Sequence, residues 1–357
     1  MEENSTIIKR YSSCVVMVIY VALIFGGTVA AQDWTEFGSE EIIRAGTEEI
    51  VVPGYSVPSY TDWNNDGVPD LIAGQGSGTE SAEVRIYLNY GEAGAPVFSN
   101  YFYAKSNGSD LLVAGSGCLG IFPRLADWNG DGRKDLLAGI GGGAVRIYLN
   151  TGTNSEPFFD GGSALKAGLP GYKVDINTGS RPTPSVTDWN NDGKKDIIMG
   201  NYDGKVYIFI NEGTDTEPDF RQEMLARVGA EALTVPSGRS SPSVCDLNRD
   251  GKKDLISGNT NGELIYYENT NTDSAAVFRE YAVLTSNGEP IDLPGTPRTR
   301  PQACDWTGDY ITDIVTGAGD GKIHVYPGIP EPVIHLMTAG IFLIFRQLIR
   351  ITTNRQE

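Results

Sequence analysis

The chain has 357 residues, of which 40% are hydrophobic, and it carries a formal net charge of −18. This length and apolar content are enough for one large domain or two ordinary ones and exclude a disordered chain, while the negative charge disfavours nucleic acid and favours cations as partners. Only two histidines, His324 and His335, are present, which leaves little room for histidine-based catalysis or a multi-histidine zinc or copper site.

Residues 1–31 have the order of a secretory signal peptide. Lys9 and Arg10 precede the apolar run CVVMVIYVALIFGG, and small residues follow it. This order predicts export, with cleavage after Ala31. An uncleaved membrane anchor is the alternative interpretation. Cys14 stands at the start of the apolar run, whereas a lipoprotein needs its cysteine directly after that run.

One acidic stretch occurs five times at intervals of about 60 residues, which indicates an internal repeat. The third copy reads DWNNDGKKDIIMG, and the copies begin at Asp62, Asp127, Asp188, Asp246 and Asp305. A short turn, an alternating run such as VYIFIN and a second turn follow most copies, and they lead to Phe98, Phe159, Phe220 or Phe278. Each unit therefore predicts four strands: one before the acidic loop, one after it, the alternating run and one near the phenylalanine.

Four antiparallel strands repeated in series are typical of β-propeller blades, because a single blade cannot bury both of its faces. We therefore expect an all-β fold, a five-bladed propeller over residues 32–330. Unit five stops after its third strand, and the sequence around Phe37 has a strand to spare. We expect this N-terminal strand to complete the last blade and to remove two sheet edges. An open array, or a ring completed by another chain, is the alternative.

The acidic loops have the oxygen spacing of a calcium site. Numbered from their first aspartate, they place oxygen side chains at positions 1, 3, 5 and 9, offer a backbone carbonyl at 7, and have glycine at 6 in units one to four. An EF-hand is excluded because position 12 is not glutamate. Asx turns without metal are the alternative, but three carboxylates within one turn repel one another without a cation. The expected ligands are Asp62, Asn64, Asp66, Val68 and Asp70; Asp127, Asn129, Asp131, Arg133 and Asp135; Asp188, Asn190, Asp192, Lys194 and Asp196; Asp246, Asn248, Asp250, Lys252 and Asp254; and Asp305, Thr307, Asp309, Ile311 and Asp313.

These loops and the strands around them resemble the FG-GAP/VCBS repeat family, found in integrin α-chain propellers and many secreted bacterial proteins. The family's loop, D-x-[DN]-x-D-G-x-x-D, matches units one to four without change. The resemblance implies a calcium-stabilised propeller used in adhesion or recognition. Unit five departs from the pattern with Thr307 at position 3 and Tyr310 at position 6, so we expect four to five structural calcium ions.

Two further patterns bear on packing. Position 2 of the loop is tryptophan in four units (Trp63, Trp128, Trp189 and Trp306) and Leu247 in unit four, which predicts packing between blades rather than stacking on a sugar. Cys245 and Cys304 directly precede position 1 in units four and five. We interpret them as small buried residues, with a disulfide between adjacent blades as the alternative.

Residues 331–357 resemble the PEP-CTERM sorting tail of bacterial envelope proteins. Pro330, Glu331 and Pro332 precede an apolar run and then Arg346 and Arg350. The resemblance implies a bacterial cell envelope location and membrane association through this segment. The apolar run is shorter than a membrane span needs, and the basic residues are spread out. An amphipathic or buried terminal helix is the alternative.

Repeated sites with equivalent ligand sets indicate structural calcium. Our first hypothesis is an exported, monomeric propeller that binds a glycan, a matrix protein or an envelope protein. A polysaccharide lyase or hydrolase is the second hypothesis, but no Ser/His/Asp set or nucleophile motif is present, and we predict no catalytic residues. A purely architectural envelope protein is the third. Only unit one, with GQGSGTESAE, has a longer hairpin.

Overall fold

The computed structural model describes residues 33–76, 81–114, 120–293 and 298–330. Trp34–Gly328 form one compact unit. The expected signal peptide, residues 1–31, and the expected sorting tail, residues 331–357, lie outside the described residues. Within the described part, the chain has no helix long and apolar enough to cross a membrane.

The described residues form five four-stranded antiparallel sheets, which confirms the all-β class. We number these sheets as blades one to five, after the acidic loop that each contains. Their strands, from first to fourth, are β5 (Ser56–Thr61), β6 (Asp70–Gln75), β8 (Val84–Tyr87) and β9 (Phe102–Tyr103); β13 (Ile121–Ala126), β14 (Asp135–Ile140), β15 (Val145–Tyr148) and β16 (Ser163–Ala164); β19 (Thr183–Thr187), β20 (Asp196–Gly200), β21 (Val206–Phe209) and β22 (Met224–Leu225); β25 (Ser241–Cys245), β26 (Asp254–Gly258), β27 (Leu264–Tyr267) and β28 (Ala282–Val283); β31 (Arg300–Cys304), β32 (Asp313–Gly317), β33 (Ile323–Tyr326) and β2 (Glu41–Ile42).

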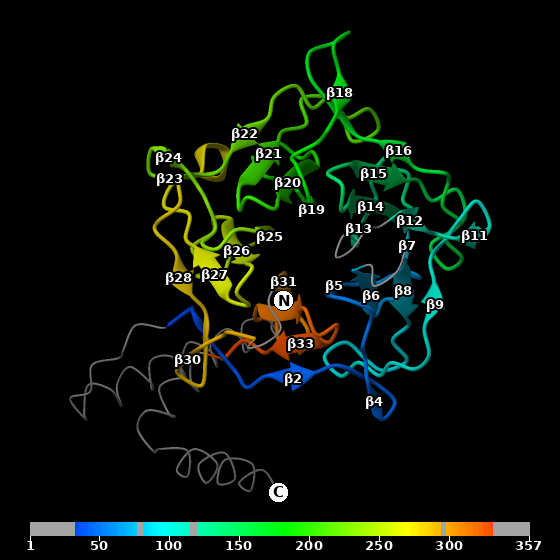
Figure 1. Cartoon of the computed structure of the whole chain (residues 1–357), viewed down its shortest axis with the longest axis vertical. Helices are drawn as coiled ribbons and strands as arrows, with labels where there is room; N and C mark the ends of the chain where they lie inside the picture. Colours follow the sequence, from blue (N-terminus) through cyan, green and yellow to red (C-terminus); the bar gives the residue numbers. More distant parts are fainter. Residues whose placement is uncertain (1–32, 77–80, 115–119, 294–297, 331–357) are drawn as a thin grey trace, which may run out of the picture. The chain divides into compact units, whose positions relative to one another are not determined.

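The first strands of the five blades surround a common axis. Strand β5 contacts β13, β13 contacts β19, β19 contacts β25, β25 contacts β31, and β31 contacts β5 again. Figure 1 shows these strands innermost and the fourth strands outermost. This closed order is the arrangement of a β-propeller.

The N-terminal strand completes blade five, as predicted. Glu41 pairs with Val325 and Ile42 with His324 in antiparallel register. Just before this strand, β1 (Glu36–Phe37) runs parallel to β29 (Thr285–Ser286) of the preceding unit. The segment therefore covers the edge of β33, so that neither an open array nor a second chain is needed to close the ring.

A short hairpin follows the fourth strand of every blade, which the sequence reasoning did not predict. Each of the first four hairpins forms a parallel bridge to the phenylalanine that recurs in the next blade (Phe98, Phe159, Phe220 or Phe278). The fifth hairpin pairs with β1. The hairpins thus join neighbouring blades. They are β3 (Arg44–Ala45) with β4 (Glu48–Glu49), β10 (Lys105–Ser106) with β11 (Ser109–Asp110), β17 (Lys166–Ala167) with β18 (Val174–Asp175), β23 (Arg227–Val228) with β24 (Glu231–Ala232), and β29 with β30 (Glu289–Pro290).

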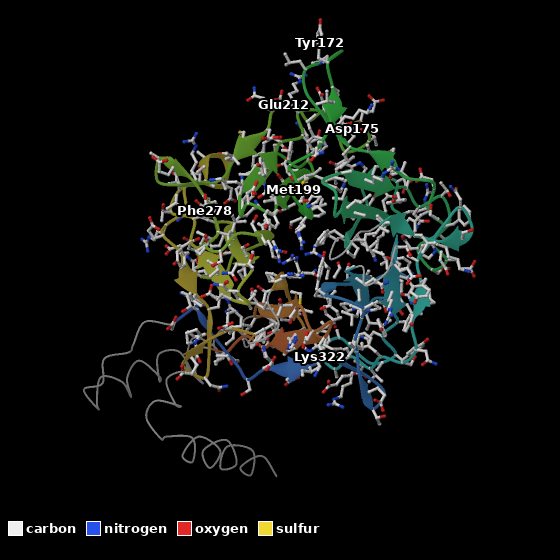
Figure 2. All side chains as sticks on the ribbon, viewed as in Figure 1. Tyr172, Asp175, Met199, Glu212, Phe278 and Lys322 are labelled. Carbon is white, nitrogen blue, oxygen red and sulfur yellow. The ribbon has the colours of Figure 1, made fainter. Side chains whose placement is uncertain are left out.

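The core lies between the blades. Trp63, Trp128, Trp189 and Trp306 are each at most 9% exposed, and each contacts the phenylalanine of the next blade at centroid distances of 5.7–6.3 Å. Leu247 shares a cluster with Phe37 in the same way. The prediction of packing between blades is therefore confirmed. Figure 2 contrasts Phe278, which lies among the strands, with Tyr172, which projects from the β17–β18 loop.

Close contact between blades also explains the glycine that ends the repeated stretch. A Cβ atom on Gly139 would lie 1.9 Å from the carbonyl oxygen of Pro182, and one on Gly200 would lie 2.2 Å from that of Ser240. Both carbonyls belong to the segment leading into the next blade's first strand, so these positions need glycine. Cys245 and Cys304 are free thiols, so the alternative of a disulfide between their blades is wrong.

Candidate metal loops and a pocket between two blades

Each acidic loop connects the first and second strands of its blade and is organised by its own side chains. In loop three, Asp188 Oδ1 and Asn190 Oδ1 both accept a hydrogen bond from the Asp192 amide, at 3.0 and 2.9 Å. Asp188 Oδ2 accepts from Gly193 N, and Asp192 Oδ1 from Lys194 N. The predicted ligands at positions 1, 3 and 5 therefore lie together on the inside of one turn.

The carboxylate at position 9 lies beneath this turn and is fully buried in all five blades. Asp196 Oδ2 accepts from Trp189 N at 2.9 Å, and its Oδ1 accepts from Asn211 N, after the third strand, at 2.7 Å. Burial raises the pKa of Asp196, and these hydrogen bonds oppose that shift. The side chain therefore ties the loop to the end of the third strand, a role that the ligand pattern did not predict. Its equivalents are Asp70, Asp135, Asp254 and Asp313.

Within the described residues, no group of three or more His, Cys, Asp or Glu side chains is arranged to hold a metal ion. The donor set nevertheless fits calcium, because it consists of carboxylate, amide and carbonyl oxygens without sulfur or imidazole. One buried oxygen of these loops is also compatible with a cation ligand. Asp127 Oδ1 is buried without a hydrogen-bond partner among the described groups, whereas the equivalent oxygen of Asp188 accepts a backbone amide.

Loop five differs from the other loops at positions 3 and 6, where its sequence departs from the repeat pattern. The hydroxyl of Thr307 donates to Asp313 Oδ2 at 3.1 Å instead of offering its oxygen to the amide of position 5. Tyr310 has a φ of 64° and is 91% exposed. A tyrosine thus occupies the left-handed conformation that glycine occupies in the other loops.

Two features of the loops were missed by the sequence reasoning. Position 4 is also left-handed in every loop, and Asn or Gly at that position in four of the five was the available signal. These residues are Asn65, Gly130, Asn191, Arg249 and Gly308.

The second missed feature is a strut from the turn after the third strand to position 8. Asp273 Oδ1 accepts from Lys253 N at 2.7 Å, while its Oδ2 accepts from Asn191 Nδ2 at 2.8 Å and contacts Lys253 Nζ at 3.1 Å. Asp273 therefore links loop four to loop three. Burial acts to raise the pKa of Asp273, but the hydrogen bonds from Lys253 and Asn191 outweigh it and lower the pKa.

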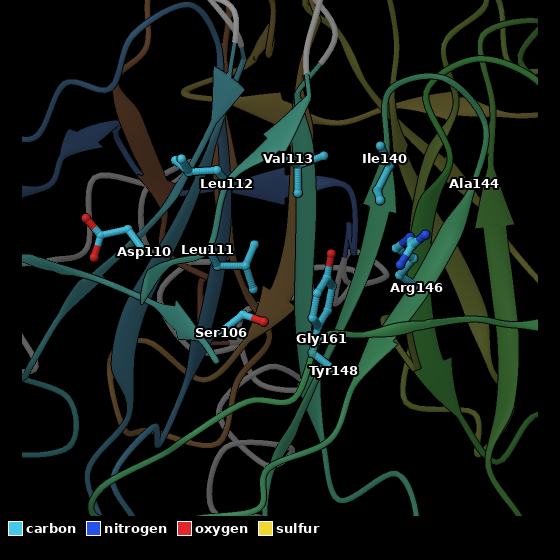
Figure 3. A pocket seen from close by; sticks show the side chains of 10 residues that line it. All are labelled: Ser106, Asp110, Leu111, Leu112, Val113, Ile140, Ala144, Arg146, Tyr148 and Gly161. Carbon is cyan, nitrogen blue, oxygen red and sulfur yellow. The ribbon is translucent and has the colours of Figure 1, made fainter. Parts of the chain in front are cut away.

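A pocket of about 500 Å³ lies between the β10–β11 hairpin, which follows blade one, and blade two. Figure 3 shows Ser106 and Leu111 on one side, Ile140 and Arg146 on the other, and Tyr148 between them. Leu111 and Leu112 lead into β12 (Val113–Ala114), which pairs with β7 (Ser81–Ala82) in the longer hairpin of unit one. The longer hairpin of unit one therefore pairs with the segment that forms one wall of this pocket.

Comparisons with known proteins concern the repeats and the fold. The Tc holotoxin pore of Photorhabdus luminescens is similar over 81% of this chain and 14% of that chain, with 17% identity and a TM-score of 0.41. BBS1N in complex with ARL6DN is similar over 81% of this chain and 85% of that chain, with 14% identity and a TM-score of 0.37. Among curated proteins, none matches the chain. Residues 188–257, which contain loops three and four, match the model of the FG-GAP-like repeat.

Proposed function

We propose that this protein is an exported, calcium-stabilised β-propeller that binds a glycan or another extracellular protein. The observation on which the proposal rests is the repeated loop, in which three oxygen side chains line one turn above a buried carboxylate. The FG-GAP-like match over residues 188–257 supports it. We place the protein in the bacterial envelope or the extracellular space as a monomer, with VCBS-type repeats and a PEP-CTERM-like tail.

Calcium would be held by the side chains at positions 1, 3, 5 and 9 and the carbonyl at position 7. When bound, the ion neutralises the carboxylates of the loop. The loop itself fixes the bend between the first and second strands, and Asp196 and its equivalents transmit that constraint to the third strand. A calcium role in stability follows, because a ligand that binds only the folded state stabilises it.

The binding site of this proposal is the pocket between unit one and blade two. Its apolar wall and its few polar groups, Ser106, Asp110 and Arg146, are typical of a site for a small polar ligand such as a sugar. The longer hairpin of unit one supports this choice, because its strand β7 pairs with the segment Val113–Ala114, which follows Leu111 and Leu112 in the pocket wall.

We propose binding rather than catalysis. His324 is 5% exposed and lies between Glu40 and Asp320, at 2.5 and 3.4 Å. It sits at the pairing of β33 with β2, so its contacts serve the closure of blade five. A general base needs access to a substrate proton, which this position does not offer.

The calcium part is tested by calorimetric unfolding of the full chain in EGTA and across a calcium titration, with bound ions counted by native mass spectrometry. We expect four or five ions and a rise in melting temperature of several degrees. D192N should lose one ion, whereas the control D203N, at an exposed aspartate outside the loops, should lose none. No bound ion and no shift would overturn the calcium assignment.

The binding part is tested on a glycan panel with the calcium-loaded chain. R146A should abolish binding of any glycan that the wild type retains. R85A is the matched control, because Arg85 and Arg146 occupy the same position in the two VRIY strands but only Arg146 lines the pocket. Equal loss in both variants would exclude this pocket as the site.

A further inference from the structure

Four arginines gather where the first strands begin, at the end opposite to the acidic loops. Arg181, Arg239 and Arg298 each stand seven residues before the first aspartate of their loop, and Arg300 begins β31. Equivalent positions of a closed repeat surround its axis. Side chains from blades three, four and five are thereby brought together, and side-chain nitrogens are seen to gather between the first strands in Figure 2.

Arg300 interacts with residues of all four other blades. Its Cζ atom lies 5.5 Å from the ring centroid of Tyr55 in blade one and 5.7 Å from that of Phe122 in blade two. The charges of Arg181 and Arg239, in blades three and four, also act on it. Arg300 therefore lies near the axis of the ring.

Two members of this cluster, Arg298 and Arg300, have no carboxylate partner within the described chain. Arg300 is 1% exposed, its Nη1 donates to the carbonyl oxygen of Thr299 at 2.7 Å, and its Nε has no partner. Neither Arg300 nor Arg298 forms an ion pair with a described carboxylate. Burial first, and then the neighbouring arginines, lower the pKa of Arg300 to about 10, so it remains charged at neutral pH.

The backbone at three of these arginines is strained. Arg181, Arg239 and Arg298 have φ angles of 65°, 60° and 89°, a region that side chains other than glycine and asparagine rarely adopt. The same unfavourable conformation is thus kept at one repeat position in three blades, always with arginine. Strain of this kind concentrates at ligand sites, where it aims a side chain.

We propose that Arg181, Arg239, Arg298 and Arg300 form a binding site for an oxyanion, the carboxylate, sulfate or phosphate group of a small ligand. Planar guanidinium groups donate paired hydrogen bonds to such groups. The rings of Tyr55 and Tyr202 lie against two guanidinium groups each, at 5.2–6.0 Å, and orient them. Arg239 and Arg298 are half-buried and Arg181 and Arg300 buried, so a ligand that enters past the first pair meets the second.

The test is thermal unfolding and titration calorimetry of the full chain with sulfate, glucuronate or glucose 6-phosphate, at constant ionic strength in chloride. We expect one bound anion per chain and a rise in melting temperature of about 3 °C or more at saturation. Glucose and added chloride should produce no rise. A response to sulfate places recognition in the oxyanion, whereas a response to the sugar anions alone identifies an anionic sugar as the ligand.

Two variants probe the site. R300M removes a buried charge that has no carboxylate partner, so this variant should fold. R239Q removes the charge of a half-buried member of the cluster. Both should weaken anion binding about tenfold or more, whereas R227M, at an exposed arginine of β23, should bind as the wild type does. Unchanged binding in R300M and R239Q, or equal weakening in R227M, would overturn the proposal. The titrations are repeated in EGTA with the same anions and variants, so that this site is tested independently of calcium binding.

Discussion

Trp128 of blade two packs against Phe220 of blade three, with the two ring centroids 6.0 Å apart. Trp128 is 5% exposed and Phe220 1%. The tryptophan belongs to the acidic loop of its blade, and its amide donates to the buried Asp135. The phenylalanine is bridged to Ala167, in the hairpin that follows blade two. One aromatic pair therefore connects a candidate metal loop, a blade hairpin and the next blade.

This relationship predicts strong coupling between the two rings. W128A and F220A should each lower the free energy of unfolding by about 3–5 kcal/mol, and the double variant should lose less than the sum by about 1 kcal/mol. W128L is the control, because Leu247 fills the same position in blade four, and it should lose less than W128A. Denaturant unfolding measures all four chains; additive losses would show that the rings act independently.

The strands were predictable because the same strand pattern recurs from unit to unit along the chain. Alternating residues in runs such as VYIFIN fix the third strand, and the spare sequence at Phe37 identified the strand that closes blade five. Packing of Trp189 and its equivalents followed from the leucine in unit four, since a sugar-stacking position would not tolerate that replacement.

The arginine cluster was not predictable from local pattern. Arg181 and Arg298 lie far apart in sequence, and both come close enough for their charges to act on Arg300 only because the ring closes. The contact of Asp273 with Asn191 was missed for a related reason: it joins two blades, so a single repeat does not contain both partners. The buried position of Asp196 also depends on the third strand, so spacing alone assigned it only a ligand role.

Loop five provides a test of backbone strain at Tyr310. Replacing this exposed residue by glycine should raise the free energy of unfolding by about 1 kcal/mol, because glycine adopts a φ of 64° without steric conflict. Y310A is the control: it removes the ring but keeps the Cβ atom, and should not stabilise the fold. Thermal unfolding in EGTA separates this effect from calcium binding; equal stability of Y310G and Y310A would refute the strain argument.

The N-terminal strand β2 should protect the edge of blade five from local unfolding. The amide of Ile43 donates to the carbonyl of Ile323 at 3.0 Å, and its side chain is 5% exposed. I43P removes the hydrogen bond and the side chain and should destabilise the fold more than I43A, which removes the side chain alone. Hydrogen exchange at Val325, opposite Glu41, should accelerate in I43P. Unaltered exchange there would mean that β2 does not protect this edge.

The strut at Asp273 predicts an acid-dependent contribution to stability. Its pKa is lowered in the folded state, so the stabilisation is present above the ordinary pKa of an aspartate, near 4, and is lost as the pH falls through the lowered value. In EGTA at pH 7, D273N should be less stable than the wild type by about 1–2 kcal/mol, because the charge-assisted hydrogen bonds with Lys253 and Asn191 are weakened. The difference should shrink below pH 4, where the wild-type carboxylate also loses its charge. D203N, at an exposed aspartate, is the matched control and should follow the wild type throughout. A D273N deficit that stays constant from pH 7 to pH 3 would assign the loss to packing rather than to charge.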